Sequence, residues 1–197
     1  MKLSNKLAEE SCRIATEHGF HEKEYPVGHW LMLAFGEMGE MINADRSNKR
    51  ANVVEFKRRS KEPSNYYDDD HIFVQWFEYY MKDTVEDELA DVIIRLLDLA
   101  GLRKIDIDKF GDSLGLSEIA CVYKENLKAQ GLPSVLFSIV NVITYHERRE
   151  TLLEDYLPNE IVSLFCLADA LKIDIYYQIE QKMRYNSLRP KFHGKKY

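Results

Sequence analysis

The sequence predicts an all-α fold, a helical bundle in a single domain covering residues 1–197, and three observations support this. Apolar residues recur with a helical period along most of the chain. Runs that alternate between apolar and polar residues, as strands do, are scarce. Glycine and proline are few, at 9 and 5 residues, and mostly mark boundaries between the helical patterns.

Eight helices account for the periodic segments. In chain order we expect them near residues 3–18, 28–46, 72–81, 84–101, 115–130, 133–149, 158–171 and 173–188. Gly19 and Gly131 occupy the positions of C-terminal caps, and Pro133 and Pro158 occupy first-turn positions. The least regular segment, residues 47–71, is interpreted as a basic insertion in the first half of the chain.

A faint internal repeat divides the chain. Residues 99–107 resemble residues 167–175, and the order of helices also matches. We therefore predict two related halves, about 1–112 and 113–197, packed about a pseudo-two-fold axis, with chance similarity between Leu-rich helices as the alternative. On this alignment, Asn141 and Thr144 take the places of Glu37 and Glu40, and Tyr156 and Asn159 take those of Glu88 and Asp91. The second half therefore lacks an acidic metal motif.

The helix expected at 28–46 has an acidic pair in an unusual place. Its apolar arc is formed by Trp30, Leu33, Ala34, Met38, Met41, Ile42 and Ala44. Glu37 falls inside this arc, and Glu40, three residues later, lies at its edge. An unpaired buried carboxylate is costly, and the usual remedies are a charged partner, a proton or a metal ion. We therefore interpret Glu37 as a functional residue.

The helix expected at 84–101 carries a second acidic pair. Its polar stripe contains Asp87, Glu88, Asp91, Arg95 and Asp98. Taken alone, Asp87 and Asp98 are expected to face water. Residues three apart lie on one helix face, so Glu88 and Asp91 present their carboxylates side by side.

Two such acidic pairs from neighbouring helices suit Mg²⁺ or Mn²⁺, which prefer oxygen ligands. The predicted metal ligands are Glu37, Glu40, Glu88 and Asp91. Bound cations would favour a polyphosphate substrate, and hydrolysis is then the expected reaction. Glu40 and Glu88 are the predicted catalytic residues, and Glu40 is an alternative base for the water rather than a ligand.

The C-terminal segment 182–197 is basic and contains no acidic residue. Four of its residues follow the spacing of one helical face: Lys182, Tyr185, Asn186 and Arg189. With Lys195 in the tail, these are the predicted phosphate-binding residues. The alternative is a disordered, solubilising terminus.

Composition limits the remaining classes of function. The net charge of −6 argues against a general polyanion binder, and so against nucleic acid as a partner. No apolar run resembles a signal peptide, and no window is expected to reach the length of a membrane span. The three cysteines are widely spaced and the six histidines show no metal-ligand spacing. We expect reduced cysteines in a cytoplasmic protein.

Two further segments leave several interpretations open. The basic run at 46–61 could be a lid over a triphosphate or a nucleic-acid patch, and a solvated loop is the favoured interpretation. The aromatic run at 66–80 could stack on a base, although packing of a short helix is the commoner use of such residues.

The acidic segments 33–46 and 86–100, with the tail residues 185–195, resemble the MazG-like members of the all-α nucleoside triphosphate pyrophosphohydrolases. The resemblance rests on Glu37-x-x-Glu40, on Glu88-x-x-Asp91 and on Tyr185-Asn186-x-x-Arg189-Pro190-x-x-His193-Gly194-Lys195. Many members have an additional Glu directly before the first motif, where this chain has Gly36, and the gap between the two motifs is unusually long.

The resemblance implies a bundle of the all-α NTP pyrophosphatase type that cleaves an NTP or dNTP to the monophosphate and pyrophosphate with Mg²⁺. It implies Glu37, Glu40, Glu88 and Asp91 as ligands, with Lys182, Asn186 and Arg189 as phosphate-binding residues. The alternatives are a helical nucleotide-binding or interaction protein without turnover and, ranked last, a di-iron bundle, which needs Glu-x-x-His pairs. A monomer of fused halves and a homodimer both fit this picture.

Overall fold

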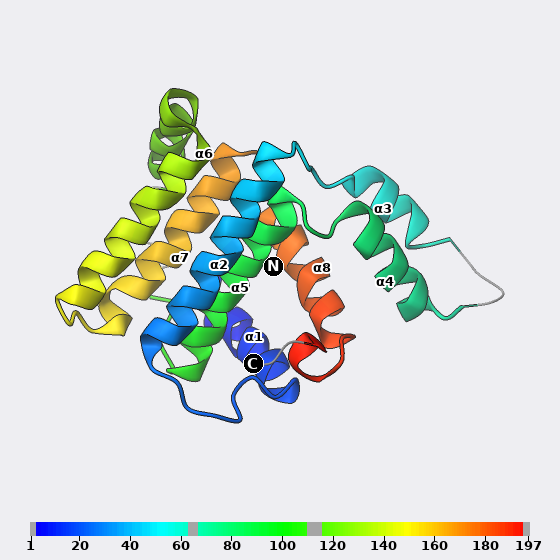
Figure 1. The fold of residues 1–197 in the computed structure, drawn as a ribbon, viewed down its shortest axis with the longest axis horizontal. Helices are drawn as coiled ribbons and strands as arrows, with labels where there is room; N and C mark the ends of the chain where they lie inside the picture. Colours follow the sequence, from blue (N-terminus) through cyan, green and yellow to red (C-terminus); the bar gives the residue numbers. More distant parts are fainter. Residues whose placement is uncertain (1–2, 63–66, 110–115, 195–197) are drawn as a thin grey trace.

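The computed structural model describes residues 3–62, 67–109 and 116–194. Within them the regular elements are all helices, without a strand, so the predicted all-α bundle is confirmed (Figure 1). The helices are α1 (Asn5–Glu17), α2 (Val27–Arg46), α3 (Val53–Arg59), α4 (Asp69–Tyr80), α5 (Val85–Leu102), α6 (Leu116–Arg148), α7 (Leu153–Ala170) and α8 (Ile175–Ser187), followed by a 3-10 turn at Lys191–Gly194.

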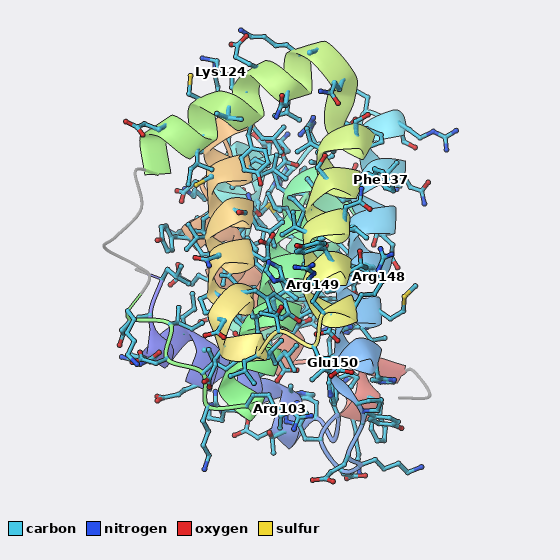
Figure 2. All side chains as sticks on the ribbon, turned by 90° about the vertical axis from the view of Figure 1, so that its left-hand side faces the viewer. Arg103, Lys124, Phe137, Arg148, Arg149 and Glu150 are labelled. Carbon is cyan, nitrogen blue, oxygen red and sulfur yellow. The ribbon has the colours of Figure 1, made fainter. Side chains whose placement is uncertain are left out.

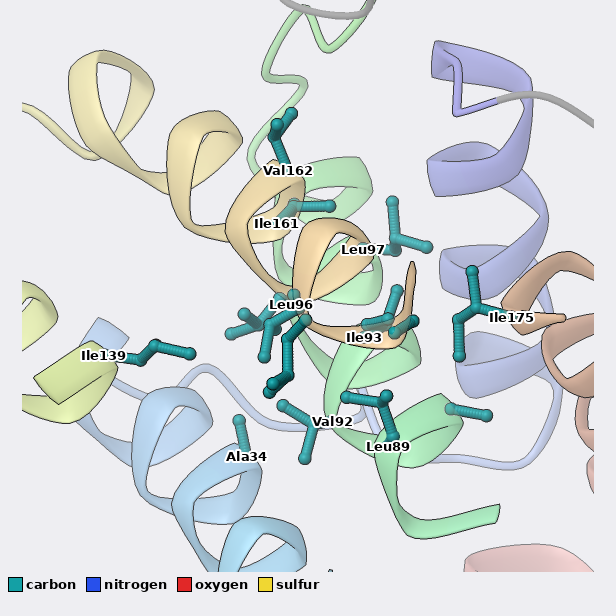
Figure 3. Packing of buried hydrophobic residues seen from close by; sticks show 14 of the residues in the cluster. Ala34, Leu89, Val92, Ile93, Leu96, Leu97, Ile139, Ile161, Val162 and Ile175 are labelled. Carbon is teal, nitrogen blue, oxygen red and sulfur yellow. The ribbon is translucent and has the colours of Figure 1, made fainter. Parts of the chain in front are cut away.

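Helix α5 is the central element. It packs against α1, α2, α7 and α8, and its apolar side chains are almost all fully buried. In Figure 3, Val92 and Leu96 of α5 lie among Ala34 of α2, Ile139 of α6 and Ile161 of α7. Each such buried side chain contributes about 1.5–3 kcal/mol to stability, so this core fixes the position of the polar stripe on α5.

Helix ends follow the predicted caps with one exception. Gly19, after α1, has a φ of 86°, and Gly131 has a φ of 77° and interrupts α6 just before Pro133. Both glycines adopt the left-handed conformation that side chains disfavour. The first-turn position expected for Pro158 is wrong, because α7 begins at Leu153 and includes this proline. Its missing N–H costs one hydrogen bond near the helix start, and its ring is buried.

The insertion at 47–71 is more ordered than expected, since it contains α3 and the first residues of α4, the helix predicted at 72–81. The two helices form a hairpin that projects from the bundle in Figure 1. A separate apolar cluster holds it together: Phe56, Phe73, Phe77, Met81 and Tyr185. Arg58 and Arg59 pair with Glu55 and Glu62 in the same segment. Phe73 and Phe77 of the aromatic run therefore pack the hairpin, whereas Tyr67 and Tyr79 are exposed and Tyr66 lies outside the described residues.

The two repeated segments have the same local geometry. Each ends a helix, α5 or α7, with a residue in the left-handed conformation, Lys104 at φ 55° and Lys172 at φ 59°. In both turns the next backbone N–H, of Ile105 or Ile173, donates to a carbonyl five residues earlier at 2.9 Å. The pseudo-two-fold relation between whole halves remains a prediction.

Helix α6 contradicts one expectation from the sequence. The stretch Glu118–Arg148 is long and apolar enough, by length and composition, to cross a membrane, and 28% of its apolar window is buried. Polar residues are spread through this stretch, so the sequence pattern did not reveal it as a candidate membrane span. Gly131 breaks the helix inside this stretch, and Phe137 points outward from its second part (Figure 2).

Close packing of α1 on α5 depends on Gly101. A Cβ atom there would lie 2.6 Å from the Ala8 carbonyl oxygen and 2.7 Å from the Cys12 Cβ. We expect Gly101→Ala to lower the free energy of unfolding by about 1–3 kcal/mol, measured by urea denaturation. Gly39→Ala is the control, because a Cβ there meets open space, and it should instead add about 0.5–1 kcal/mol. Equal effects of the two substitutions would contradict the close contact.

Candidate metal centre

The Glu37 side chain reaches from α2 toward α5. Glu37 is 6% exposed, and its Oε1 atom accepts hydrogen bonds from the Arg95 Nη2 at 3.0 Å and Nε at 3.2 Å. Arg95 lies on α5, one turn beyond Asp91. The packing of α2 against α5 therefore brings Glu37 and Arg95 together. The prediction that Glu37 is buried despite its charge is confirmed.

Three of the four predicted ligands converge. Oxygen atoms of Glu37, Glu88 and Asp91 all lie within 4.8 Å of one another. Thr84 caps the start of α5 by accepting a hydrogen bond from the Asp87 N–H, and this start positions Glu88 and Asp91 on the face toward α2. A group of this size and chemistry matches the oxygen donors that Mg²⁺ takes from proteins.

Glu40 lies outside this group. It is exposed on α2 and lines a hollow of about 360 Å³ together with Lys49, Asp83 and Glu88. Glu88 thus separates the buried carboxylates from a hollow open to solvent. The charge of Glu40 still acts on Glu88, because it contributes to raising the pKa of that carboxyl.

Lys182 on α8 occupies a position that differs from the predicted phosphate contact. Its Nζ atom is buried and lies 2.7 Å from the Asp87 Oδ2 and 2.8 Å from the Asp91 Oδ2. Burial alone lowers the pKa of a lysine, but Asp91 and Asp87 outweigh this effect and raise the pKa of Lys182. Lys182 therefore remains charged and holds two α5 carboxylates in place.

The expectation that Asp87 and Asp98 face water is wrong. Asp87 is 2% exposed beneath α8, and Asp98 is 5% exposed beneath α1. Helical periodicity located the polar stripe of α5 but could not show that two other helices cover it. Burial raises the pKa of Asp87, and Lys182 counteracts part of that rise.

In the described part of the chain, ion pairs reach three of the four carboxylates at this centre. Arg95 pairs with Glu37, and Lys182 pairs with Asp87 and Asp91. Glu88 forms neither a hydrogen bond nor an ion pair through its carboxylate with another described residue, and it is 3% exposed. Burial, followed by the charges of Asp91 and Asp87, raises the pKa of Glu88 to about 8. A proton or a cation is therefore needed at Glu88 near neutral pH.

A small cavity of about 50 Å³ adjoins the centre between α1, α5 and α8, and its wall includes Glu37, Asp91, Arg95, Asn186 and Arg189. It admits a few waters or an ion but not a whole nucleotide. A second hollow of about 240 Å³ shares Phe20 with it, and its wall includes Tyr25, His29 and Trp30.

The remaining predicted phosphate-binding residues differ in position. Asn186 is 8% exposed, and its Oδ1 atom has no hydrogen-bond partner in the described part of the chain. Arg189 lines the same cavity, with its guanidinium carbon 5.5 Å from the Tyr185 ring centre. Tyr185 itself stacks on Phe77 and donates to the Glu78 Oε1 at 2.7 Å, so it belongs to the packing of the hairpin. Lys195 lies outside the described residues.

Sequence reasoning missed one contact that shapes the centre. Asp87 and Lys182 form a buried ion pair between α5 and α8, and neither was predicted as a partner of the other. The signal was present, because Asp87 and Asp91 are four residues apart on one face and Lys182 lies on a basic helix face of the second half.

No family model, curated protein or solved structure matches this chain.

Glu160 on α7 is a second buried acid without a partner, remote from the centre in sequence. It is 7% exposed, no other described residue forms a hydrogen bond or ion pair with it, and burial raises its pKa to about 7. The folded protein therefore holds a proton more tightly than the unfolded chain, so stability falls as pH rises from about 4.5 to 7. The free energy of unfolding of Glu160→Gln, measured by urea denaturation relative to the unsubstituted protein, should therefore increase by about 1–3 kcal/mol as the pH rises from 4.5 to 8. A gain that does not change with pH would contradict this assignment.

Proposed function

We propose that this chain is a Mg²⁺-dependent nucleoside triphosphate pyrophosphohydrolase that releases a nucleoside monophosphate and pyrophosphate. One observation carries the proposal: carboxylates from α2 and α5 converge within 4.8 Å, and Glu88 among them has no positive partner. The resemblance of both acidic motifs to the MazG-like enzymes supports the same reaction. Mn²⁺ would substitute for Mg²⁺, since both prefer oxygen ligands.

The donor set fits the ion. Glu37, Glu88 and Asp91 would hold Mg²⁺, and the ion would supply neutralisation of phosphate oxygens and a lower pKa for the attacking water. Arg95 fixes Glu37, and Lys182 fixes Asp91, so both cations are positioning residues. Such held ligands lose little conformational entropy on binding.

The other residues divide the remaining roles. Glu40, exposed beside Glu88, is proposed to orient the water and accept its proton. Arg189 and Asn186 at the small cavity are proposed to contact the phosphate chain. The hollow beyond Phe20, with Trp30 and the stacked pair Tyr25 and His29, is proposed for the base, because aromatic rings stack on bases of any identity.

The proposal is tested with a panel of NTPs and dNTPs in the presence of Mg²⁺, with monophosphate and pyrophosphate measured separately. Equal amounts of the two products, with loss of both on addition of a chelator, are expected. Release of inorganic phosphate instead would indicate a different phosphohydrolase, and no product with any nucleotide would contradict the proposal.

A catalytically inactive nucleotide-binding protein of the same fold is the second candidate, and Lys182 is the observation that favours it. Its ammonium already lies between Asp87 and Asp91 and neutralises part of the cluster without a metal ion. Such a protein would be stabilised by nucleotide with Mg²⁺ but would release no pyrophosphate. Thermal melting with a non-hydrolysable triphosphate analogue, together with the panel above, separates the two candidates.

A further inference from the structure

A second group of potential ligands lies at the other end of α5. Atoms of Cys12 on α1, His21 in the turn after α1, and Asp98 on α5 lie within 4.8 Å of one another. The Cys12 Sγ is 3.9 Å from the His21 Nδ1, and the His21 Nε2 is 3.0 Å from the Asp98 Oδ1 and 3.3 Å from its Oδ2. The donors are thus sulfur, nitrogen and oxygen, unlike the all-oxygen centre described above.

Thr16 fixes the tautomer of His21. The Thr16 Oγ1 lies 2.7 Å from the Cys12 carbonyl oxygen and must donate its single proton to that oxygen. The same Oγ1 lies 2.8 Å from the His21 Nδ1, so it can only accept a hydrogen bond there. The Nδ1 atom therefore carries a proton, and Nε2 is directed at Asp98. A hydrogen bond from one ring nitrogen to a supporting group is the usual arrangement of a metal-bound histidine.

The Asp98 carboxylate has capacity left for a cation. Its side chain is 7% exposed, and its buried Oδ1 atom lies 3.0 Å from the His21 Nε2, an ion-pair contact without hydrogen-bond geometry. The only contact with hydrogen-bond geometry from His21 is made to Oδ2. A carboxylate oxygen has lone pairs beyond the one that faces His21, so Asp98 can also accept a cation.

Packing brings Cys12 to this carboxylate. Gly101, one turn after Asp98, lets α1 approach so closely that the Cys12 Cβ lies 2.7 Å from the position that a Cβ atom of residue 101 would occupy. Trp30 covers the His21 ring edge-on, with ring centres 5.4 Å apart. A surface hollow of about 760 Å³ lined by Cys12 and Thr16 provides a route from solvent.

We infer that Cys12, His21 and Asp98 form a second metal site, for a borderline transition-metal ion such as Zn²⁺. One thiolate, one imidazole and one carboxylate make three of the four ligands of tetrahedral zinc, with the fourth supplied by water. Mg²⁺ does not take sulfur ligands, so this site and the carboxylate centre select different ions. The inference does not depend on the proposed hydrolase activity.

Cys12 itself is a conditional ligand. A thiol binds a metal ion as its thiolate, so metal binding at Cys12 releases the thiol proton and the affinity increases with pH.

Co²⁺ is the probe for the test, because a cobalt–thiolate bond gives a near-ultraviolet charge-transfer absorption that oxygen ligands do not give. The chelator-treated protein is expected to develop this absorption up to one equivalent of Co²⁺ and to lose it when Zn²⁺ is added. Cys12→Ser should abolish the absorption, and Cys166→Ser should retain it. Thr16→Val should weaken Co²⁺ binding by about 10- to 100-fold, because it removes the support of His21.

Glu88→Gln should leave the absorption unchanged, so failure of the carboxylate centre and failure of this site are distinguishable. Absence of the absorption in the folded protein, or its persistence in Cys12→Ser, would overturn the inference and leave His21 and Asp98 as an ion pair only.

A second measurement covers the case in which Cys12→Ser fails to fold. In the unsubstituted protein, Zn²⁺ should slow alkylation of Cys12 by iodoacetamide at least about 10-fold. Peptide mass spectrometry measures the extent of alkylation. Alkylation of the exposed Cys121 should not change. Equal rates at Cys12 with and without Zn²⁺ would also overturn the inference.

Discussion

Glu88→Gln should lower nucleotide hydrolysis by at least about 100-fold while raising the melting temperature of the metal-free protein. The two effects have one cause. Glu88 is buried without a positive partner, so the folded protein disfavours its ionised form, and that ionised form is what a divalent cation needs. The amide has almost the same shape but neither the charge nor the affinity for Mg²⁺.

The measurements are pyrophosphate release and thermal melting with Mg²⁺ or with chelator. Mg²⁺ should raise the melting temperature of the unsubstituted protein and have little effect on Glu88→Gln. Glu160→Gln is the matched control, because Glu160 is also buried without a partner but lies on α7. It should keep full hydrolysis and the full response to Mg²⁺. Retained hydrolysis in Glu88→Gln would remove Glu88 from the catalytic site.

Lys182→Met should cost about 3–5 kcal/mol of folding free energy, the largest stability effect expected in this protein. Methionine fills a similar volume but leaves Asp87 and Asp91 buried without the ammonium that now lies 2.7 and 2.8 Å from them. Urea denaturation at neutral pH measures the loss. Because more negative charge is then unbalanced, Mg²⁺ should recover more stability in Lys182→Met than in the unsubstituted protein.

Lys128→Met is the control for this substitution. Lys128 pairs with Glu125 at 2.8 Å, but both side chains are about two-thirds exposed. Water screens such a pair, so its loss should change stability by less than about 1 kcal/mol. Similar losses for Lys128→Met and Lys182→Met would show that Lys182 does not balance buried carboxylates.

Local patterns predicted the fold well, because each depends on residues near in sequence. The helix at Val85–Leu102, the cap at Gly19 and the burial of Glu37 all follow from periodicity, glycine conformation and the position of a charge within an apolar arc. The start of α7 was misplaced because a proline is tolerated inside the helix, at Pro158.

Contacts between helices distant in sequence could not be predicted in this way. The pairing of Lys182 with Asp87 joins residues 95 positions apart, and the pairing of His21 with Asp98 joins residues 77 apart. Periodicity assigns a residue to a polar stripe but does not show which helix covers that stripe. For this reason Asp98 was expected in water and His21 was not expected among metal ligands.

The most direct test of the central claim is a crystal structure determined after soaking with Mn²⁺, with anomalous scattering used to locate the ion. An anomalous peak about 2 Å from carboxylate oxygens of Glu37, Glu88 and Asp91 is expected. No peak at these residues at saturating Mn²⁺, with Arg95 still on Glu37 and Lys182 still on Asp91, would contradict the account.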